Sequence, residues 1–175
     1  DLSLEEEFTT QIINVEWLNN NEYLAITSHL RPSMEQYLIV ELNNDYNIET
    51  HNGFGFTWNS DFTNLYYIQA EPNYSEDASD MILDKKGNVL YETTDGNRLN
   101  GDLRITPNHQ YLMCDVYTSQ DTNELFILEK QDEKTLALVA KIPNLTGNGA
   151  FLDNESLTIT ENSEVQTFLI KDLIN

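Results

Sequence analysis

The chain has 175 residues, of which 39% are hydrophobic, and it carries 30 acidic against 9 basic residues, a formal net charge of −21. This length and apolar content predict one compact domain with its own core. No apolar run approaches the roughly 18 residues of a membrane-spanning helix, and the negative field disfavours nucleic acid and anionic lipid surfaces as partners. The chain begins at Asp1 without a methionine, which slightly favours a secreted or extracytoplasmic protein whose leader has been removed.

An internal repeat runs through the sequence. Each copy starts with a large apolar anchor, continues through a polar turn, and enters an apolar strand six or seven residues after the anchor. The four copies are Trp17 in WLNNNEYLAIT, Trp58 in WNSDFTNLYYIQ, Ile105 in ITPNHQYLMCDV and Phe151 in FLDNESLTIT. The anchors are spaced 41, 47 and 46 residues apart, about the length of one four-stranded propeller blade. We expect the anchors to be buried in equivalent positions.

Further strands follow each anchor in chain order, with turn residues between them. The predicted strands lie at 37–42, 48–50, 81–83, 89–93, 125–128, 136–142, 157–159 and 168–170. Their apolar runs are short and rich in Tyr, Ile, Val, Thr and Phe, which favours strands over long helices. Residues 1–7 form at most one short acidic turn.

The fourth copy is incomplete, because only 24 residues follow Phe151 and they leave no room for an outer strand. Residues 8–13 (FTTQII) are typical of a strand that belongs to no copy of its own. We therefore expect an all-β propeller of four blades, whose last blade is closed by the N-terminal strand. The blades cover about 14–52, 53–98, 99–143, and 144–175 together with 8–13. Four blades form either a complete small ring or half of a larger one.

The pattern of anchor, turn and strand resembles the TolB-like and WD-like β-propeller repeats, whose units often carry a W-S-P-D-G-x-x-L-A-like core. WNSDFTNLYY is the nearest match, ITPNHQYLMC is looser, and FLDNESLTIT keeps mainly the pattern. The resemblance covers nearly the whole chain, although members of these families usually have six to eight blades. It implies a binding platform, and some related propellers are hydrolases or lyases.

Motifs for catalysis or metal binding do not emerge from the sequence. Of the three histidines, His29 and His51 fall in loops on one predicted face, whereas His109 falls on the opposite face, too far to share a metal. No nucleophile elbow, zinc signature or phosphate-binding loop is present, and the Asn- and Asp-rich turns lack the spacing of a calcium loop. Cys114 lies in the apolar run YLMCDV, which predicts a buried structural thiol. We expect no metal and no cofactor.

Residues on one predicted face of the propeller form the candidate binding surface. Arg31 and Arg98 fall in loops of this face, where a guanidinium can hold a carboxylate or phosphate, or pair internally with neighbouring carboxylates. Asn52, Tyr74, Asn100 and Asn148 lie on the same predicted face near the channel mouth. Lys85, Lys86, Lys130 and Lys134 fall on the opposite face.

The sequence therefore predicts a non-catalytic binding module that uses this face. Its partner is a protein or small-molecule ligand, basic or cationic in view of the −21 charge, and the chain itself is a monomer or dimer. The alternative is a carboxylate-based hydrolase or lyase with a site at the channel mouth, for which the sequence selects no particular pair of carboxylates.

Overall fold

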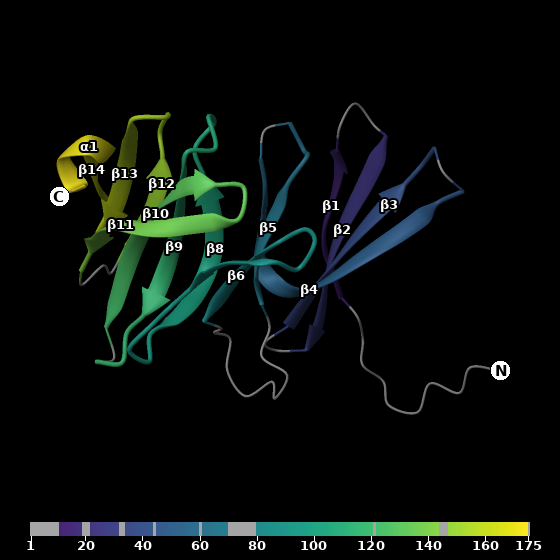
Figure 1. Cartoon of the computed structure of the whole chain (residues 1–175), viewed down its shortest axis with the longest axis horizontal. Coiled ribbons are helices and arrows are strands. Elements are labelled where there is room, and N and C mark those ends of the chain that lie inside the picture. The colour runs from purple at the N-terminus through teal and green to yellow at the C-terminus, as the bar shows by residue number, and fades with distance from the viewer. Residues whose placement is uncertain are drawn as a thin grey trace. The chain divides into compact units, whose positions relative to one another are not determined.

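A computed structural model describes residues 11–18, 22–31, 34–43, 45–59, 61–69, 80–120, 122–143 and 147–174 (Figure 1). Within these ranges the chain forms antiparallel β-strands and one short helix, α1 (Ile170–Leu173). Every strand that the sequence predicts overlaps an observed strand, although residue 170 begins α1 instead of ending a strand. The expectation of an all-β chain without long helices is confirmed.

The chain divides into two compact units. The first comprises residues 1–54 and 70–77, and the second comprises residues 55–69 and 78–175. The boundary falls inside strand β4 (Asn47–Trp58), whose first eight residues belong to the first unit.

The first unit is an antiparallel meander of β1 (Gln11–Leu18), β2 (Tyr23–Arg31), β3 (Met34–Glu41) and the first part of β4. Its buried apolar side chains come from these strands and include Leu18, Ala25 and Ile39. The buried Tyr37 donates a hydrogen bond from its hydroxyl to Glu16 Oε1 at 2.8 Å, which ties β3 to β1.

The N-terminal strand does not have the role that its sequence suggests. Residues 11–13 are the start of β1, where Gln11 pairs with His29 and Ile12 with Ser28 on β2, and residues 8–10 lie outside the described residues. The prediction that 8–13 completes the last blade is therefore wrong for residues 11–13. The reason is local: no turn separates this β-prone run from Trp17, so one strand continues through a register shift between Ile12 and Asn14.

The second unit contains three successive antiparallel groups of strands. The first group is the end of β4 with β5 (Leu65–Gln69), β6 (Met81–Asp84) and β7 (Val89–Glu92). The second is β8 (Arg98–Ile105), β9 (Tyr111–Tyr117), β10 (Asn123–Asp132) and β11 (Thr135–Ile142). The third is β12 (Asn148–Phe151), β13 (Ser156–Glu161) and β14 (Glu164–Leu169). Within each group, neighbours in sequence are neighbours in the sheet.

The four anchors occupy equivalent places in their hairpins. Trp17 pairs with Leu24, Ile105 with Leu112 and Phe151 with Leu157. Trp58 is the last residue of β4, and β5 begins seven residues later. Their burial differs from the expectation, because Trp17 is 60% exposed and the other three anchors are half-buried. A shared hairpin position therefore does not give a shared degree of burial.

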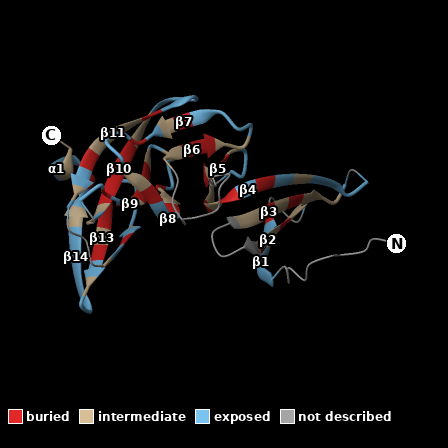
Figure 2. Ribbon diagram, turned by 90° about the horizontal axis from the view of Figure 1, so that it is seen from below, coloured by how far each residue is buried: buried red, intermediate tan, exposed pale blue. Residues whose placement is uncertain are grey.

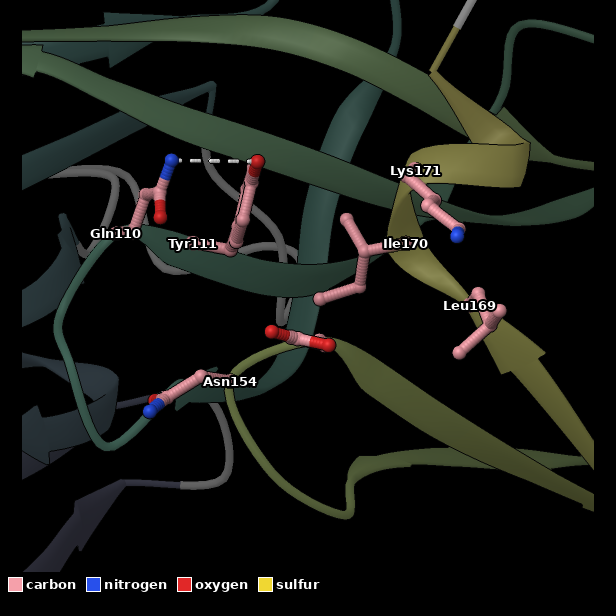
Figure 3. Close-up of a pocket in the computed structure, with 7 residues that line it drawn as sticks. Gln110, Tyr111, Asn154, Leu169, Ile170 and Lys171 are labelled. Atoms are coloured by element: carbon pink, nitrogen blue, oxygen red, sulfur yellow. Dashed lines mark hydrogen bonds between the residues drawn. The ribbon is translucent and has the colours of Figure 1, made fainter.

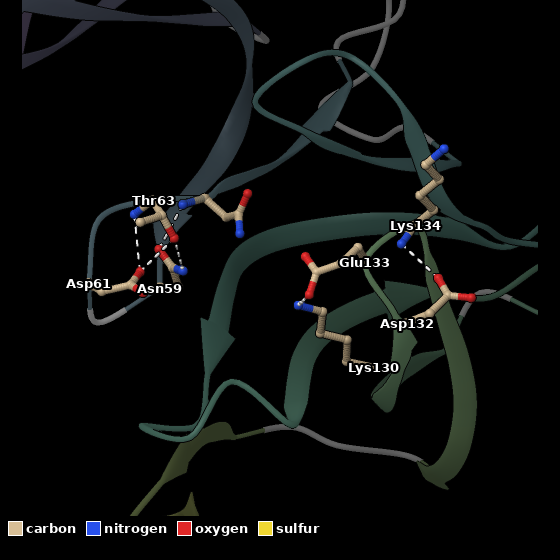
Figure 4. A network of polar contacts seen from close by, with 8 residues as sticks. Asn59, Asp61, Thr63, Lys130, Asp132, Glu133 and Lys134 are labelled. Atoms are coloured by element: carbon tan, nitrogen blue, oxygen red, sulfur yellow. Dashed lines mark hydrogen bonds and ion pairs between the residues drawn. The ribbon is translucent and has the colours of Figure 1, made fainter.

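The turn after each described anchor in the second unit closes around one Asx side chain. In each case an Oδ1 atom accepts a hydrogen bond from the backbone N–H two residues later, as in an Asx turn. The pairs are Asp61 with Thr63 at 3.1 Å, Asn108 with Gln110 at 3.1 Å, and Asp153 with Glu155 at 2.8 Å. Figure 4 shows the first of these turns. These bonds explain why the repeat keeps Asp or Asn at this point.

Part of the core of the second unit lies between the sheets of β8–β11 and β12–β14. One buried cluster joins side chains from β9, β10, β11, β13 and α1: Met113, Leu125, Ile127, Ala140, Leu157, Ile159 and Ile170. Figure 2 shows buried residues, in red, along β9, β10 and β13, whereas β14 is mostly exposed. Cys114 is buried, as its apolar context predicts, and burial raises the pKa of its thiol.

Candidate functional site

A polar cleft of about 240 Å³ lies in the second unit, where β8, β9, β10 and β12 come together. We call it the Asn100 cleft. Its walls carry three amides, two carboxylates and two glycines: Asn100, Gly101, Asp115, Asn123, Glu124, Gly147 and Asn148. No aliphatic, aromatic or basic side chain is part of this lining, so the cleft offers hydrogen bonds and negative charge.

The register of the strands explains how the cleft forms. Asn100 pairs with Asp115 across β8 and β9, and Asn123 begins β10 opposite Tyr117. The pairing of β8 with β9 shifts register between Asn100 and Arg104. Gly101 lies at this irregularity with φ +74°, and a Cβ atom there would stand 3.1 Å from Asp115 Oδ2. Glycine therefore lets the backbone of β8 approach the carboxylate closely.

Arg104 connects three of the four strands that form the cleft. Its Nη2 forms an ion pair with Asp115 Oδ2, and its Nη1 donates a hydrogen bond to the backbone oxygen of Gly149 at 2.7 Å. One guanidinium thus joins β8, β9 and β12. The two charged side chains are 22% and 29% exposed, so the pair lies largely out of solvent, where a charge-assisted bond contributes more than it does at the surface.

The environment of Asp115 opposes its ionisation in spite of this cation. Burial is the largest influence and raises the pKa of Asp115, Arg104 lowers it by charge and by hydrogen bonding, and Asp102 raises it. The net direction is upward. The carboxyl can accept a further donor or attract a further cation, because either would relieve the cost of its burial.

The candidate residues of the sequence are only partly brought together. Asn100 and Asn148, 48 residues apart in the chain, line the same cleft. Arg98 is two residues before Asn100 at the start of β8, is half-buried, and pairs with Tyr117. Arg31 ends β2 and Asn52 lies in β4, both in the first unit, and Tyr74 lies outside the described residues.

The exposed Asn52 and the buried His51 have contacts within the first unit. The Oδ1 atom of Asn52 accepts a hydrogen bond from Gln36 Nε2 at 3.3 Å. His51 Nε2 lies 3.2 Å from Glu49 Oε1, His29 is in β2, and His109 is in the turn between β8 and β9 with φ 59°. Among the residues that the structure describes, no three His, Cys, Asp or Glu side chains are grouped so as to hold a metal ion.

Sequence reasoning missed the two carboxylates that line the Asn100 cleft and the arginine that pairs with one of them. Arg104 is one of only nine basic residues and lies in the strand that leads to an anchor. Asp115 interrupts the apolar run of β9, and a charged residue at such a place in a buried strand is a signal for a partner nearby. Glu124 had no signal of its own among 30 acidic residues.

A second cleft, of about 310 Å³, lies at the turns that follow the anchors (Figure 3). We call it the Tyr111 cleft, and it is lined by Gln110, Tyr111, Asn154, Glu155, Leu169, Ile170 and Lys171. Asn108 N–H donates to Asn154 Oδ1 at 2.7 Å, which holds the two turns together. Gln110 Nε2 donates to the Tyr111 hydroxyl at 3.3 Å, and burial is the main cause of the raised pKa of Tyr111. None of these residues was a candidate from the sequence.

Within the described residues, no helix has the length and apolar character needed to cross a membrane. A comparison of the chain with models of known protein families found no match, and a comparison with curated proteins found none either.

Proposed function

We propose that this chain is a four-bladed β-propeller that acts as a non-catalytic binding module, and that its Asn100 cleft receives a cationic group of a protein or small-molecule partner. The observation that carries the proposal is the meeting of Asn100 and Asn148 with Asp115 and Glu124 in one cleft. These residues come from four strands of two sheets, so a ligand there would be held by a rigid frame.

Two features support the propeller. The second unit repeats an antiparallel meander, and each of its anchors leads into an Asx turn of the same kind. The first unit is a four-stranded meander of the same order, with Trp17 in the corresponding hairpin position. The meander of the first unit and the three of the second make four, the number of blades in the proposed ring, and the last meander has three strands.

The lining of the cleft supports a cationic ligand group. Amide and carboxylate oxygens accept hydrogen bonds from an ammonium or guanidinium group, and Asp115 and Glu124 contribute negative charge. The net charge of −21 adds a long-range field that attracts a basic partner. Arg104 neutralises part of Asp115, which leaves Glu124 and the three amides as the main recognition groups.

A carboxylate-based hydrolase or lyase is the second candidate, favoured by the raised pKa of Asp115 beside Glu124 in a cleft. The ion pair with Arg104 weighs against it, because a carboxyl that is held by a guanidinium is a poor general acid. Turnover of nitrophenyl glycosides that Asp115→Asn and Glu124→Gln both abolish would favour the enzyme.

Calorimetric titration with L-argininamide, a small dication, tests binding at the cleft. We expect saturable binding that weakens as salt rises, and that weakens about tenfold in Glu124→Gln and in Asn148→Ala because each loses a charge-assisted or neutral hydrogen bond. Glu133→Gln is the matched control, since Glu133 is 79% exposed and pairs with Lys130 away from the cleft. Equal affinity in all four proteins would contradict the proposal.

A further inference from the structure

Within the described residues of the second unit, no strand pairs with the outer edge of β14. The sheet of β12–β14 has three strands, and β14 lies at its end, paired with β13. In the neighbouring sheet of β8–β11, the third strand, β10, has a partner on each side, β9 and β11. After β14 the chain turns into α1 instead of returning as a fourth strand. The sheet of β12–β14 therefore has no strand in the fourth position, which β11 occupies in the sheet of β8–β11.

The register identifies the backbone groups at this edge. Ile170 N–H donates to the backbone oxygen of Glu155 at 2.8 Å. Glu155 and Ile170 therefore form a hydrogen-bonded pair, which directly precedes the pair of Ser156 and Leu169 in the ladder of β13 and β14. Bonded and non-bonded pairs alternate along antiparallel strands. The intervening residues Val165, Thr167 and Leu169 therefore direct their backbone N–H and C=O groups away from β13, toward the open edge.

This edge lacks the features that usually prevent strand pairing. The sequence of β14, EVQTFL, contains no proline and no lysine, and its pairing with β13 has no bulge. Its one charged residue, Glu164, is at the start of the strand. Val165 is 63% exposed and Leu169 is 42% exposed, so apolar surface accompanies the backbone groups. An edge of this kind is a template for another strand.

The charges near the edge indicate which strand it would accept. Glu161 and Glu164 lie at the hairpin end, and Asp172 with Lys171 lies beyond the other end. A second copy would bring another charge of −21 to the same place, whereas a segment rich in lysine or arginine would complement it. We propose that β14 receives an extended, basic segment of a partner protein as the fourth strand of its sheet.

The side chains of the added strand face two environments. Phe168 pairs with Leu157 on the face that packs against the core, while Val165 pairs with Thr160 on the exposed face. Because successive residues alternate, Glu164 lies on the face of Phe168. A segment that alternates apolar with basic residues would therefore place its basic groups beside Glu164 and its apolar groups beside the exposed Val165 and Leu169. This requirement gives the site selectivity for an alternating sequence, because successive side chains point to opposite faces.

Fluorescence anisotropy with a labelled peptide of alternating lysine and valine, about eight residues long, tests the proposal with the full chain. We expect saturable binding at about 0.15 M salt. Thr167→Pro removes an outward N–H and leaves the ladder with β13 intact, so it should weaken binding about tenfold with little change in melting temperature. Thr167→Lys, which keeps the backbone donor and adds a repelling charge, is the second variant and should also weaken binding. Thr160→Ala on β13 is the matched control.

Three results would overturn the proposal. The first is the absence of saturable binding, or equal binding by the Thr167 variants and the original chain. The second is equal binding of a peptide that alternates lysine with proline, since such a peptide has the charge but cannot form a strand. The third is a dimer, seen by sedimentation without peptide, that Thr167→Pro abolishes, because the occupant would then be a second copy.

Discussion

At the scale of the residue, the turn between β12 and β13 depends on Asp153. Its Oδ1 atom accepts hydrogen bonds from Glu155 N–H, Ser156 N–H and the Ser156 hydroxyl, each at 2.8 Å. These bonds hold the pKa of Asp153 below its usual value of 3.8, and the bond from Glu155 N–H has the largest effect. The ionised form is therefore the one that stabilises the folded chain.

Asp153→Ala should lower the melting temperature at neutral pH, with Asp172→Ala, an exposed residue of α1, as the control. Because the folded pKa of Asp153 is depressed, its contribution is complete above 3.8 and is lost as the pH falls through the folded value. Melting curves of the two chains should thus converge in acid. If the difference in melting temperature between the two chains stays constant as the pH falls from 7 to well below 3.8, the charge of Asp153 has no part in the effect.

Arg104 offers a second test at this scale. Arg104→Ala leaves Asp115 without its cation and the oxygen of Gly149 without its donor, so we expect a loss of about 2 kcal/mol in the free energy of unfolding. Lys130→Ala is the control, because its partner Glu133 is exposed and a surface pair contributes about 0.5 kcal/mol or less. Urea denaturation measures both, and equal losses would contradict the structural role of Arg104.

At the scale of the element, two glycines with positive φ differ in their surroundings. Gly55 in β4 has φ +64°, and a Cβ there would stand 2.6 Å from the backbone oxygen of Gly101. Gly87, in the turn before β7, has φ +79° with no atom within 4 Å of such a Cβ. Gly55→Ala should cost about 3 kcal/mol or more, and Gly87→Ala about 1 kcal/mol from the backbone alone. Similar losses in urea denaturation would mean that β4 and β8 do not approach as described.

Local chemistry made the strands and turns predictable from the sequence. Asp61 and Asp153 close their turns with their own side chains, so the pattern of anchor and turn carries a direct structural meaning. The role of residues 11–13 and the burial of Trp17 were mispredicted. Residues 11–13 continue β1 because no turn separates them from Trp17, and the exposure of Trp17 depends on packing that its place in the repeat does not determine.

At the scale of the whole molecule, the candidate site was predictable only through topology. Asn100 and Asn148 were grouped because loops of the same kind were expected to share a face, and they line one cleft. Asp115 and Glu124 escaped prediction because composition offers many carboxylates and the register alone brings these two to the cleft. The ring of four blades remains a prediction.

Amide chemical-shift mapping with L-argininamide tests whether the Asn100 cleft binds a cationic group. We expect shifts that gather at Asn100, Gly101 and Asn148, that Glu124→Gln removes, and that acetate does not cause. Shifts that spread evenly over the acidic surface, or that gather at the Tyr111 cleft, would contradict this binding.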